Sequence, residues 1–297
     1  MINKQSKKHH YLPRHYLRGF TNDDGSFYAY DKINDKVFLT NPDNTFFEND
    51  LNTVTTPKGD RSVFVEDQYT NIENVCWPSL DKIRESNTKK AVSYSDKEFL
   101  YLFLLFQYWR LPINIPAVEE ISETAFTRSN PVDYFQIKNK NGESVPKKII
   151  EHIRGSDAFK KTFRLMLPFA PLLKDKEWGE KINRWRFYYT QNDKPSYLVG
   201  DSPILRKNSN QDPVDILGDF LFPVSGKILL INITPIPIKD LPPEFIIQYN
   251  TAMIHCAHRF VVCHDEELLK ALVSYYKIYV TNKKTDEIID EMFGILS

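Results

Sequence analysis

The sequence predicts an α+β fold: a helical N-terminal half with a short hairpin, packed with an antiparallel sheet of about four strands and C-terminal helices. Two observations predict this class. In most of the first 173 residues, apolar positions recur every three or four residues, whereas from 184 to 233 they alternate with a period near two. Helices followed by a series of strands favour segregated α+β packing over a doubly wound parallel sheet.

The segment KKHHYLPRHYLRGFTND, residues 7–23, predicts a short helix over PRHYLR. Proline is favoured at the first position of a helix, and Gly19 suits a left-handed helix end. Arg14 and Arg18 lie four positions apart and share a face. We expect the opposite side to dock on the rest of the chain through its apolar residues, Tyr16, Leu17 and Phe20.

Further elements of the first half follow from local patterns. The runs SFYAYDK and KVFLTN are aromatic and β-branched, and the three residues between them predict a hairpin. Helical spacing over Phe64–Glu85 predicts a long helix that Pro78 should bend or divide. A buried helix then extends from a cap at 94–96 to just before Pro112, and another covers 117–127.

The second half is expected to contain the sheet. A helical stretch at 147–173 is interrupted near Gly155 and Pro168. Four runs then alternate as strands do: RWRFYYT, PSYLVGDSPIL, DFLFPV and KILLINI. A tight turn, VSGK, joins the last two, so we expect an antiparallel sheet. Helices at 244–258 and 266–276 flank a short FVVC strand.

The size and composition indicate a globular protein. A chain of 297 residues can bury a large core, and we predict a single domain over 1–297, with a candidate sub-boundary at the polar stretch 130–146. Three cysteines are too few for a disulfide framework and indicate the reducing cytoplasm. The longest apolar run, FLYLFLLF, is far shorter than the roughly 20 residues of a membrane span, so no membrane partner is expected.

Charge and motifs exclude several classes of function. Lys and Arg number 39, as do Asp and Glu, so the whole molecule has no net field to attract nucleic acid, although residues 1–22 carry a charge of +5. This basic start lacks the apolar stretch of a secretory signal and is not expected to be a targeting peptide. The sequence contains no Walker A loop, GxGxxG turn, HExxH, CxxC pair or GxSxG elbow.

Two stretches carry weaker signals. Three histidines and two cysteines at 255–264 are zinc-ligand types, but their spacing is irregular and the cysteines are expected to pack in the core. Residues 184–189, RWRFYY, combine arginines and aromatics that stack on single-stranded nucleic acid, but strand alternation places half of them in the core.

The stretch HHYLPRHYLRGF resembles the H-Y-x-P-x-x-Y-L-x-x-F signature of the DUF4238 family of uncharacterised, mostly bacterial proteins. Further stretches are similar to family elements in the same order: two glutamates seven apart (Glu66 and Glu73), Q-x-x-R-x-P (Gln107, Arg110), S/G-D-x-P (Asp201), FPVS, and a closing N-x-x-x-x-x-x-A-x-R. The resemblance covers most of the chain. It implies a family but no activity, because the family itself is uncharacterised.

The polar side chains in these elements need partners. Glu66 and Glu73 lie two turns, or about 10.5 Å, apart along one helix face, which is too far for both to hold one ion directly. We expect each to take a different cation, such as Arg14 and Arg110. Gln107 and Arg110 share a face of an otherwise apolar helix, where burial without partners is costly.

Two interpretations of these residues remain open. In one, the glutamates and arginines form a buried ion-pair network that fixes the N-terminal segment onto the helical half. In the other, they line a cleft into which Asp201 projects from the end of a strand. Such a set suits a phosphate-containing substrate or a divalent metal.

The second interpretation predicts a hydrolase or nuclease that acts on a phosphate-containing substrate. Its predicted catalytic residues are His10, Glu66, Glu73 and Asp201, and its predicted substrate-binding residues are Arg14, Gln107 and Arg110. A divalent metal would sit on the aspartate and one glutamate, the histidine would act as acid or base, and two arginines would hold the phosphate. The alternative is a non-catalytic sensor or binding module, for example in phage defence, whose basic N-terminal segment contacts a nucleic acid or nucleotide.

Overall fold

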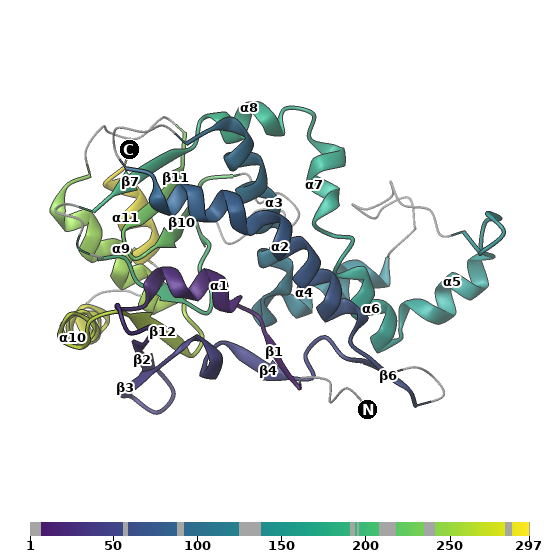
Figure 1. Ribbon diagram of the computed structural model, residues 1–297, viewed down its shortest axis with the longest axis horizontal. Coiled ribbons are helices and arrows are strands. Elements are labelled where there is room, and N and C mark those ends of the chain that lie inside the picture. Colours follow the sequence, from purple (N-terminus) through teal and green to yellow (C-terminus); the bar gives the residue numbers. More distant parts are fainter. Residues whose placement is uncertain are drawn as a thin grey trace.

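The structure, a computed structural model, describes residues 7–55, 59–87, 92–124, 138–190, 194, 196–207, 218–234, 241–282 and 287–296 (Figure 1). The α-helices of these residues are α1 (Arg14–Leu17), α2 (Phe64–Glu85), α3 (Tyr94–Arg110), α4 (Ile115–Glu123), α5 (Lys147–Arg154), α6 (Asp157–Phe163), α7 (Phe169–Lys174), α8 (Trp178–Asn183), α9 (Pro243–Cys256), α10 (Glu266–Asn282) and α11 (Ile288–Gly294).

The strands of the described residues are β1 (Lys8–His10), β2 (Phe27–Asp31), β3 (Lys36–Thr40), β4 (Phe47–Asn49), β5 (Val54–Thr55), β6 (Arg61–Ser62), β7 (Arg186–Tyr189), β8 (Val199–Gly200), β9 (Leu205–Arg206), β10 (Phe220–Ser225), β11 (Ile228–Asn232) and β12 (Phe260–Cys263). They form two four-stranded antiparallel sheets, in the orders β7-β11-β10-β9 and β3-β2-β12-β8, and two pairs, β1-β4 and β5-β6. The predicted α+β class is confirmed.

The two long helices of the first half have nearly the predicted bounds. α2 is continuous through Pro78, which therefore does not divide it. α3 begins after Ser93, whose Oγ accepts a hydrogen bond from the backbone N–H of Asp96 at 3.1 Å, and ends before Pro112. α2 and α3 pack side by side (Figure 1). This packing places the glutamates of α2 against Arg110 at the end of α3.

The sheet topology differs from the prediction in two respects. The hairpin β2–β3 forms as predicted, but β2 also pairs with β12, with Tyr30 opposite Val261, so the hairpin belongs to a sheet with a C-terminal strand. The prediction of a single strand over PSYLVGDSPIL is wrong. β8 pairs with β12 and β9 pairs with β10, so this stretch crosses from one sheet to the other at Asp201–Pro203, where proline has no N–H for a ladder.

The N-terminal segment docks as predicted. Tyr16, Leu17 and Phe20 are buried, and the Tyr16 hydroxyl donates a hydrogen bond to the carbonyl of Pro223 in β10 at 2.6 Å. The prediction that Gly19 is left-handed is wrong, because the chain continues there as a 3-10 turn over Arg18–Phe20. The segment is thus an integral part of the fold and not an appended patch.

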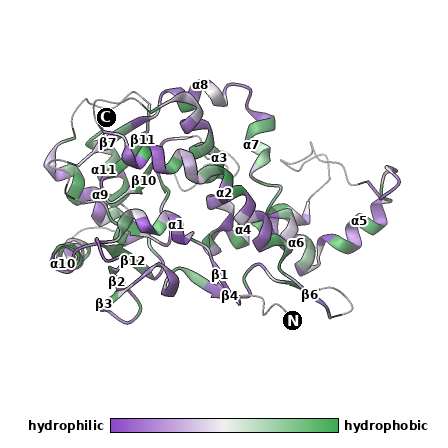
Figure 2. Ribbon diagram, viewed as in Figure 1, coloured by the Kyte–Doolittle hydropathy of each residue, from purple (hydrophilic) through white to green (hydrophobic). Residues whose placement is uncertain are grey.

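The main hydrophobic core takes side chains from both halves of the chain. Leu12 and Tyr16 of the N-terminal segment, Leu104 of α3 and Phe222 of β10 belong to one buried cluster. Figure 2 shows hydrophobic residues concentrated around β10, β11 and α9. The two halves of the chain thus share one core, and the single domain over 1–297 stays a prediction. The candidate sub-boundary at 130–146 lies partly outside the described residues.

The helices of the described residues do not combine the length and hydropathy of a membrane span. None of them is both long enough and apolar enough to cross a bilayer.

Candidate functional site

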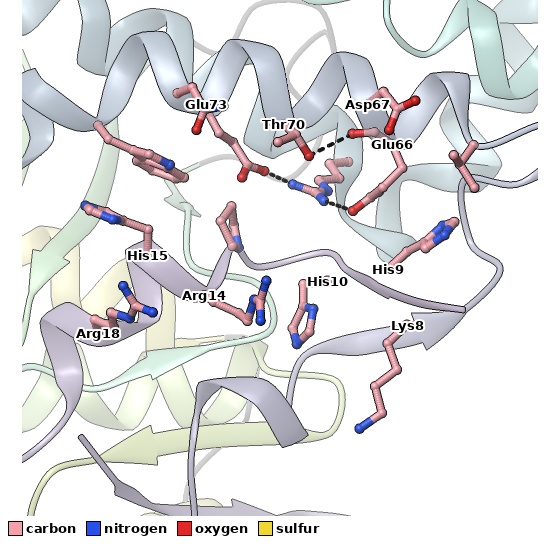
Figure 3. A pocket seen from close by; sticks show the side chains of 15 residues that line it. Lys8, His9, His10, Arg14, His15, Arg18, Glu66, Asp67, Thr70 and Glu73 are labelled. Carbon is pink, nitrogen blue, oxygen red and sulfur yellow. Dashed lines mark hydrogen bonds and ion pairs between the residues drawn. The ribbon is translucent and has the colours of Figure 1, made fainter. Parts of the chain in front are cut away.

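A polar pocket of about 810 Å³ lies between α2 and the segment that carries β1 and α1. We call it the N-terminal pocket. One wall presents His10, Arg14 and Arg18, and the other presents residues of α2, among them Glu66 and Glu73. Figure 3 shows both glutamates on α2, above the segment with His10 and Arg14. Five of the seven predicted site residues line this pocket: His10, Arg14, Glu66, Glu73 and Arg110.

Glu66 and Glu73 bind the same cation. The Arg110 Nη2 donates to Glu66 Oε1 at 2.9 Å, and its Nη1 donates to Glu73 Oε1. The prediction of a separate cation for each glutamate is therefore wrong. A guanidinium presents its N–H groups in a fork, so two carboxylates two turns apart reach different nitrogens of one group. The guanidinium also lies over the ring of Tyr69, 4.7 Å from its centroid.

Burial and charge act in opposite directions on this cluster. Burial raises the pKa of Glu73, and the nearby Arg110 only partly offsets that increase. Burial acts to lower the pKa of Arg110, but Glu73 and Glu66 outweigh it and hold that pKa above its ordinary value. Only 4% of the Arg110 side chain is exposed, so its charge is balanced by the two glutamates and not by solvent.

Three residues that the sequence did not single out for this cluster extend it. Asn52 Nδ2 donates to Glu66 Oε2 at 2.6 Å, and its Oδ1 accepts from Arg164. The backbone N–H of Asn52 donates to His9 Nδ1 at 2.9 Å. His9 lies in β1, Asn52 in the loop before β5 and Arg164 at the end of α6. No sequence spacing links these three residues.

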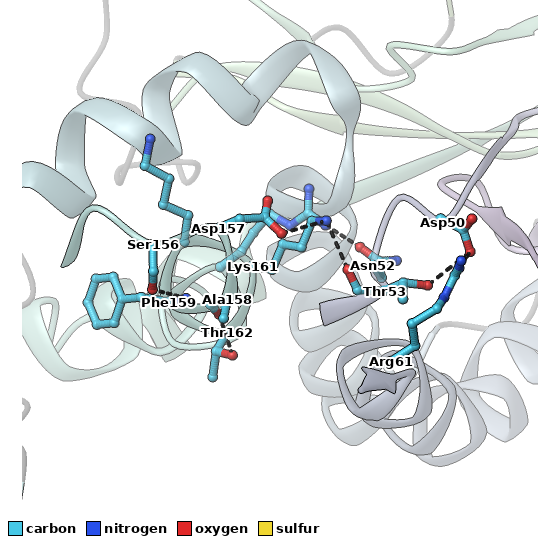
Figure 4. A network of polar contacts seen from close by, with 12 residues as sticks. Asp50, Asn52, Thr53, Arg61, Ser156, Asp157, Ala158, Phe159, Lys161 and Thr162 are labelled. Atoms are coloured by element: carbon cyan, nitrogen blue, oxygen red, sulfur yellow. Dashed lines mark hydrogen bonds and ion pairs between the residues drawn. The ribbon is translucent and has the colours of Figure 1, made fainter. Parts of the chain in front are cut away.

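A second set of contacts fixes the loop that carries Asn52 (Figure 4). Lys161 of α6 donates to the carbonyl of Thr53 at 2.9 Å and pairs with Asp157 at 3.0 Å. Arg61 of β6 pairs with Asp50 on the other side of the loop. The loop is therefore held from α6 and from β6, which keeps Asn52 in place behind Glu66.

The arginines of the β1–α1 wall are oriented toward solvent. Arg14 Nη1 pairs with Asp43 Oδ1 at 2.8 Å, and 58% of the Arg14 side chain remains exposed. The predicted pairing of Arg14 with a glutamate of α2 is therefore wrong. Arg18 is exposed and lines the same wall. These two guanidinium groups remain accessible to an anion in the pocket.

His10 lies between these arginines and the buried cluster. Burial, together with the charges of Arg14 and Arg110, lowers its pKa to about 4, so the ring is neutral at pH 7. A hydrogen bond with the backbone of Asp43 acts in the other direction. Its Nε2 is buried and has no hydrogen-bond partner among the described residues. The ring packs on Phe47, with centroids 5.5 Å apart.

Gln107 forms a hydrogen bond with the backbone behind the N-terminal pocket. It is 2% exposed, and its Nε2 donates to the carbonyl of Tyr11 at 2.6 Å. It does not line the N-terminal pocket. The prediction that its amide needs a partner is confirmed for Nε2, which binds the backbone that joins β1 to α1. Its Oε1 is buried and has no hydrogen-bond partner among the described residues.

Asp201 lies outside the N-terminal pocket. It lines a separate cavity of about 510 Å³ with Tyr11, Phe47 and Arg259. Its carboxylate accepts three backbone N–H groups, from His258 at 2.7 Å, Arg259 at 2.7 Å and Phe260 at 3.0 Å. The prediction that Asp201 projects into the cleft of the glutamates is therefore wrong. Its carboxylate instead fixes the chain where β12 begins.

No metal site is assembled from the described residues. No group of three His, Cys, Asp or Glu side chains among them is placed to hold an ion. Asp201 and the glutamates line different cavities, so they do not form the predicted shared site. Cys256 and Cys263, which the sequence placed in a weak zinc motif, have thiols whose pKa burial raises to about 11.

The fold and the pocket define an α+β protein with a polar pocket built around its N-terminal segment. A family model described as a protein of unknown function, DUF4238, matches residues 8–267, and the chain therefore belongs to this family. The match confirms the resemblance seen in the sequence. No curated protein and no solved structure matches the chain.

Proposed function

We propose that the protein is a hydrolase that binds a phosphate-containing substrate in the N-terminal pocket. Arg14 and Arg18 hold the phosphate, and His10 acts as the general base. The observation that carries the proposal is the neutral His10, which lines the same pocket as two exposed arginines and whose buried Nε2 has no hydrogen-bond partner among the described residues.

Phosphate bound by Arg14 would raise the pKa of His10. Burial lowers the pKa of His10 most and Arg14 lowers it further, and an anion held by that arginine offsets the charge of the arginine. The pKa of His10 then rises from about 4 toward the ordinary value of a histidine, which makes the ring a stronger base in the complex than in the free protein. The bound substrate thus strengthens the base that activates the attacking water.

The chemical step needs only water and this base. A water oxygen bonds to phosphorus while Nε2 of His10 takes one of its protons, and the bond from phosphorus to the ester oxygen breaks. The leaving oxygen takes a proton from solvent, and the histidine later returns its own proton to solvent. Glu66, Glu73 and Gln107 act as positioning residues, since they hold Arg110 and the backbone beside His10.

One observation favours a non-catalytic binding module as the second candidate. Arg110 is engaged by two glutamates and Asp201 by three backbone N–H groups, so fewer polar groups are free to take part in chemistry than the sequence predicted. In that case the pocket binds a phosphate-containing ligand without converting it.

Separate measurements of binding and turnover test these two functions. Calorimetry with inorganic phosphate gives the affinity, and phosphate release from a set of monoesters and from bis(p-nitrophenyl) phosphate gives turnover. We expect Arg14→Ala with Arg18→Ala to weaken phosphate binding by about tenfold or more, because each charge-assisted hydrogen bond contributes about 1.5–3 kcal/mol. The pair Lys147→Ala with Lys148→Ala on α5 makes the same charge change far from the pocket.

His10→Gln is expected to keep phosphate binding within about threefold and to lower turnover by about 10²–10⁴-fold. His152→Gln on α5 is its control. Turnover that His10→Gln leaves unchanged would refute the catalytic role. Phosphate binding that depends on the arginines, with no turnover of any ester, would instead establish the binding module.

A further inference from the structure

The walls of the N-terminal pocket carry opposite charge. Lys8, Arg14 and Arg18 line the wall formed by β1 and α1, and Asp43 offsets only part of their charge. The α2 wall carries Asp67 in addition to the two glutamates that share one guanidinium, so its net charge is negative. A ligand with one anionic end fits between these walls, whereas a chain of phosphates is repelled by the α2 wall.

The α2 wall also offers unused hydrogen-bonding groups. The side chains of Asp67 and Asn74 are exposed, line the pocket and make no hydrogen bond to any described residue. Thr70 lies between them on the same face, and its hydroxyl donates to the carbonyl of Glu66 at 3.1 Å, which leaves the oxygen able to accept. The wall therefore presents mainly acceptors in a row.

His9 adds a buried donor to the same pocket. Its side chain is 1% exposed, and its Nδ1 accepts the backbone N–H of Asn52, so in the neutral ring the proton is on Nε2. Nε2 has no hydrogen-bond partner among the described residues. A buried donor without an acceptor is costly, and a ligand oxygen would supply the missing acceptor.

We propose that the ligand of this pocket is a phosphorylated polyhydroxy compound, such as a sugar phosphate. The proposal rests on the proposed binding of phosphate by Arg14 and Arg18. The hydroxyl groups of the ligand donate hydrogen bonds to Asp67 and Thr70. They also form hydrogen bonds with the Asn74 amide and accept one from His9, since a hydroxyl both donates and accepts. A cavity of about 810 Å³ is of the size that holds a small molecule.

Three probes separate this inference from the proposed function. Calorimetry measures the affinity of the protein for inorganic phosphate, for ribose 5-phosphate and for pentyl phosphate, which has the same chain length without hydroxyls. We expect ribose 5-phosphate to bind about tenfold or more tightly than the other two. Asp67→Ala with Asn74→Ala should remove this preference without weakening the binding of inorganic phosphate, because neither side chain holds the phosphate. The fold should be kept, since both side chains are exposed and alanine is a strong helix former.

The exposed pair Lys148→Ala and Glu151→Ala on α5 is the matched control for a double change on a helix surface. If phosphate binds but the three probes bind equally, the inference is overturned and the proposed function stands. If none of the three binds, the proposed function fails. Tighter binding of a single-stranded oligonucleotide, with affinity that falls steeply with salt, would also overturn the inference.

Discussion

At the scale of single residues, the contacts of Arg110 show why the sequence could predict only part of the site. The helical spacing of Glu66 and Glu73 correctly placed both on one face. Their separation excludes a shared point-like ion, but the two terminal nitrogens of one guanidinium can each reach one carboxylate. Asn52 and Arg164 could not be predicted, because their contacts join parts of the chain 112 positions apart. Asp201 matched a motif, yet its carboxylate has a backbone role that no side-chain pattern encodes.

The buried cluster gives a residue-scale prediction. Arg110→Met leaves two largely buried carboxylates without their cation, and we expect a loss of about 3–5 kcal/mol in the free energy of unfolding, measured with urea. The triple change with Glu66→Gln and Glu73→Gln removes the charges together and should cost clearly less. A loss below about 1 kcal/mol for the single variant would contradict the assignment.

At the scale of elements, the β1–α1 segment is held by contacts to α2, α3 and β10. Arg84 of α2 donates to the carbonyls of His15 at 3.0 Å, Tyr16 at 2.6 Å and Val224 at 3.2 Å. The sequence predicted that the segment docks through its apolar residues, and they are buried. It did not predict Arg84 as the group that binds the end of α1, because helical periodicity describes one element at a time.

Gly19 tests this docking. A Cβ at position 19 would lie 2.6 Å from Arg84 Nη2, and this guanidinium is held by three carbonyls and cannot easily move. We expect Gly19→Ala to cost about 1–3 kcal/mol of unfolding free energy, measured with urea. Gly155→Ala is the control, because that site has a negative φ and open space around it. Equal effects of the two substitutions would show that Arg84 does not restrict this position.

At the scale of the whole molecule, long-range pairing limited the prediction. The α+β class, the hairpin and the antiparallel strands β7, β10 and β11 followed from local periodicity. The pairing of β2 with β12 did not, since these strands are more than 200 residues apart. With equal numbers of acidic and basic residues, the whole chain carries no net charge, so any attraction for an anion must come from a local wall such as that of the N-terminal pocket.

The most direct test of phosphate binding beside His10 is an NMR titration of its ring with and without inorganic phosphate. In the free protein we expect a pKa of about 4, because burial and the two arginines oppose the charged ring. Saturating phosphate should raise this pKa toward the ordinary 6.5, since the anion offsets the charge of Arg14 and favours the imidazolium. A pKa near 6.5 in the free protein, or one that phosphate does not change, would contradict the account.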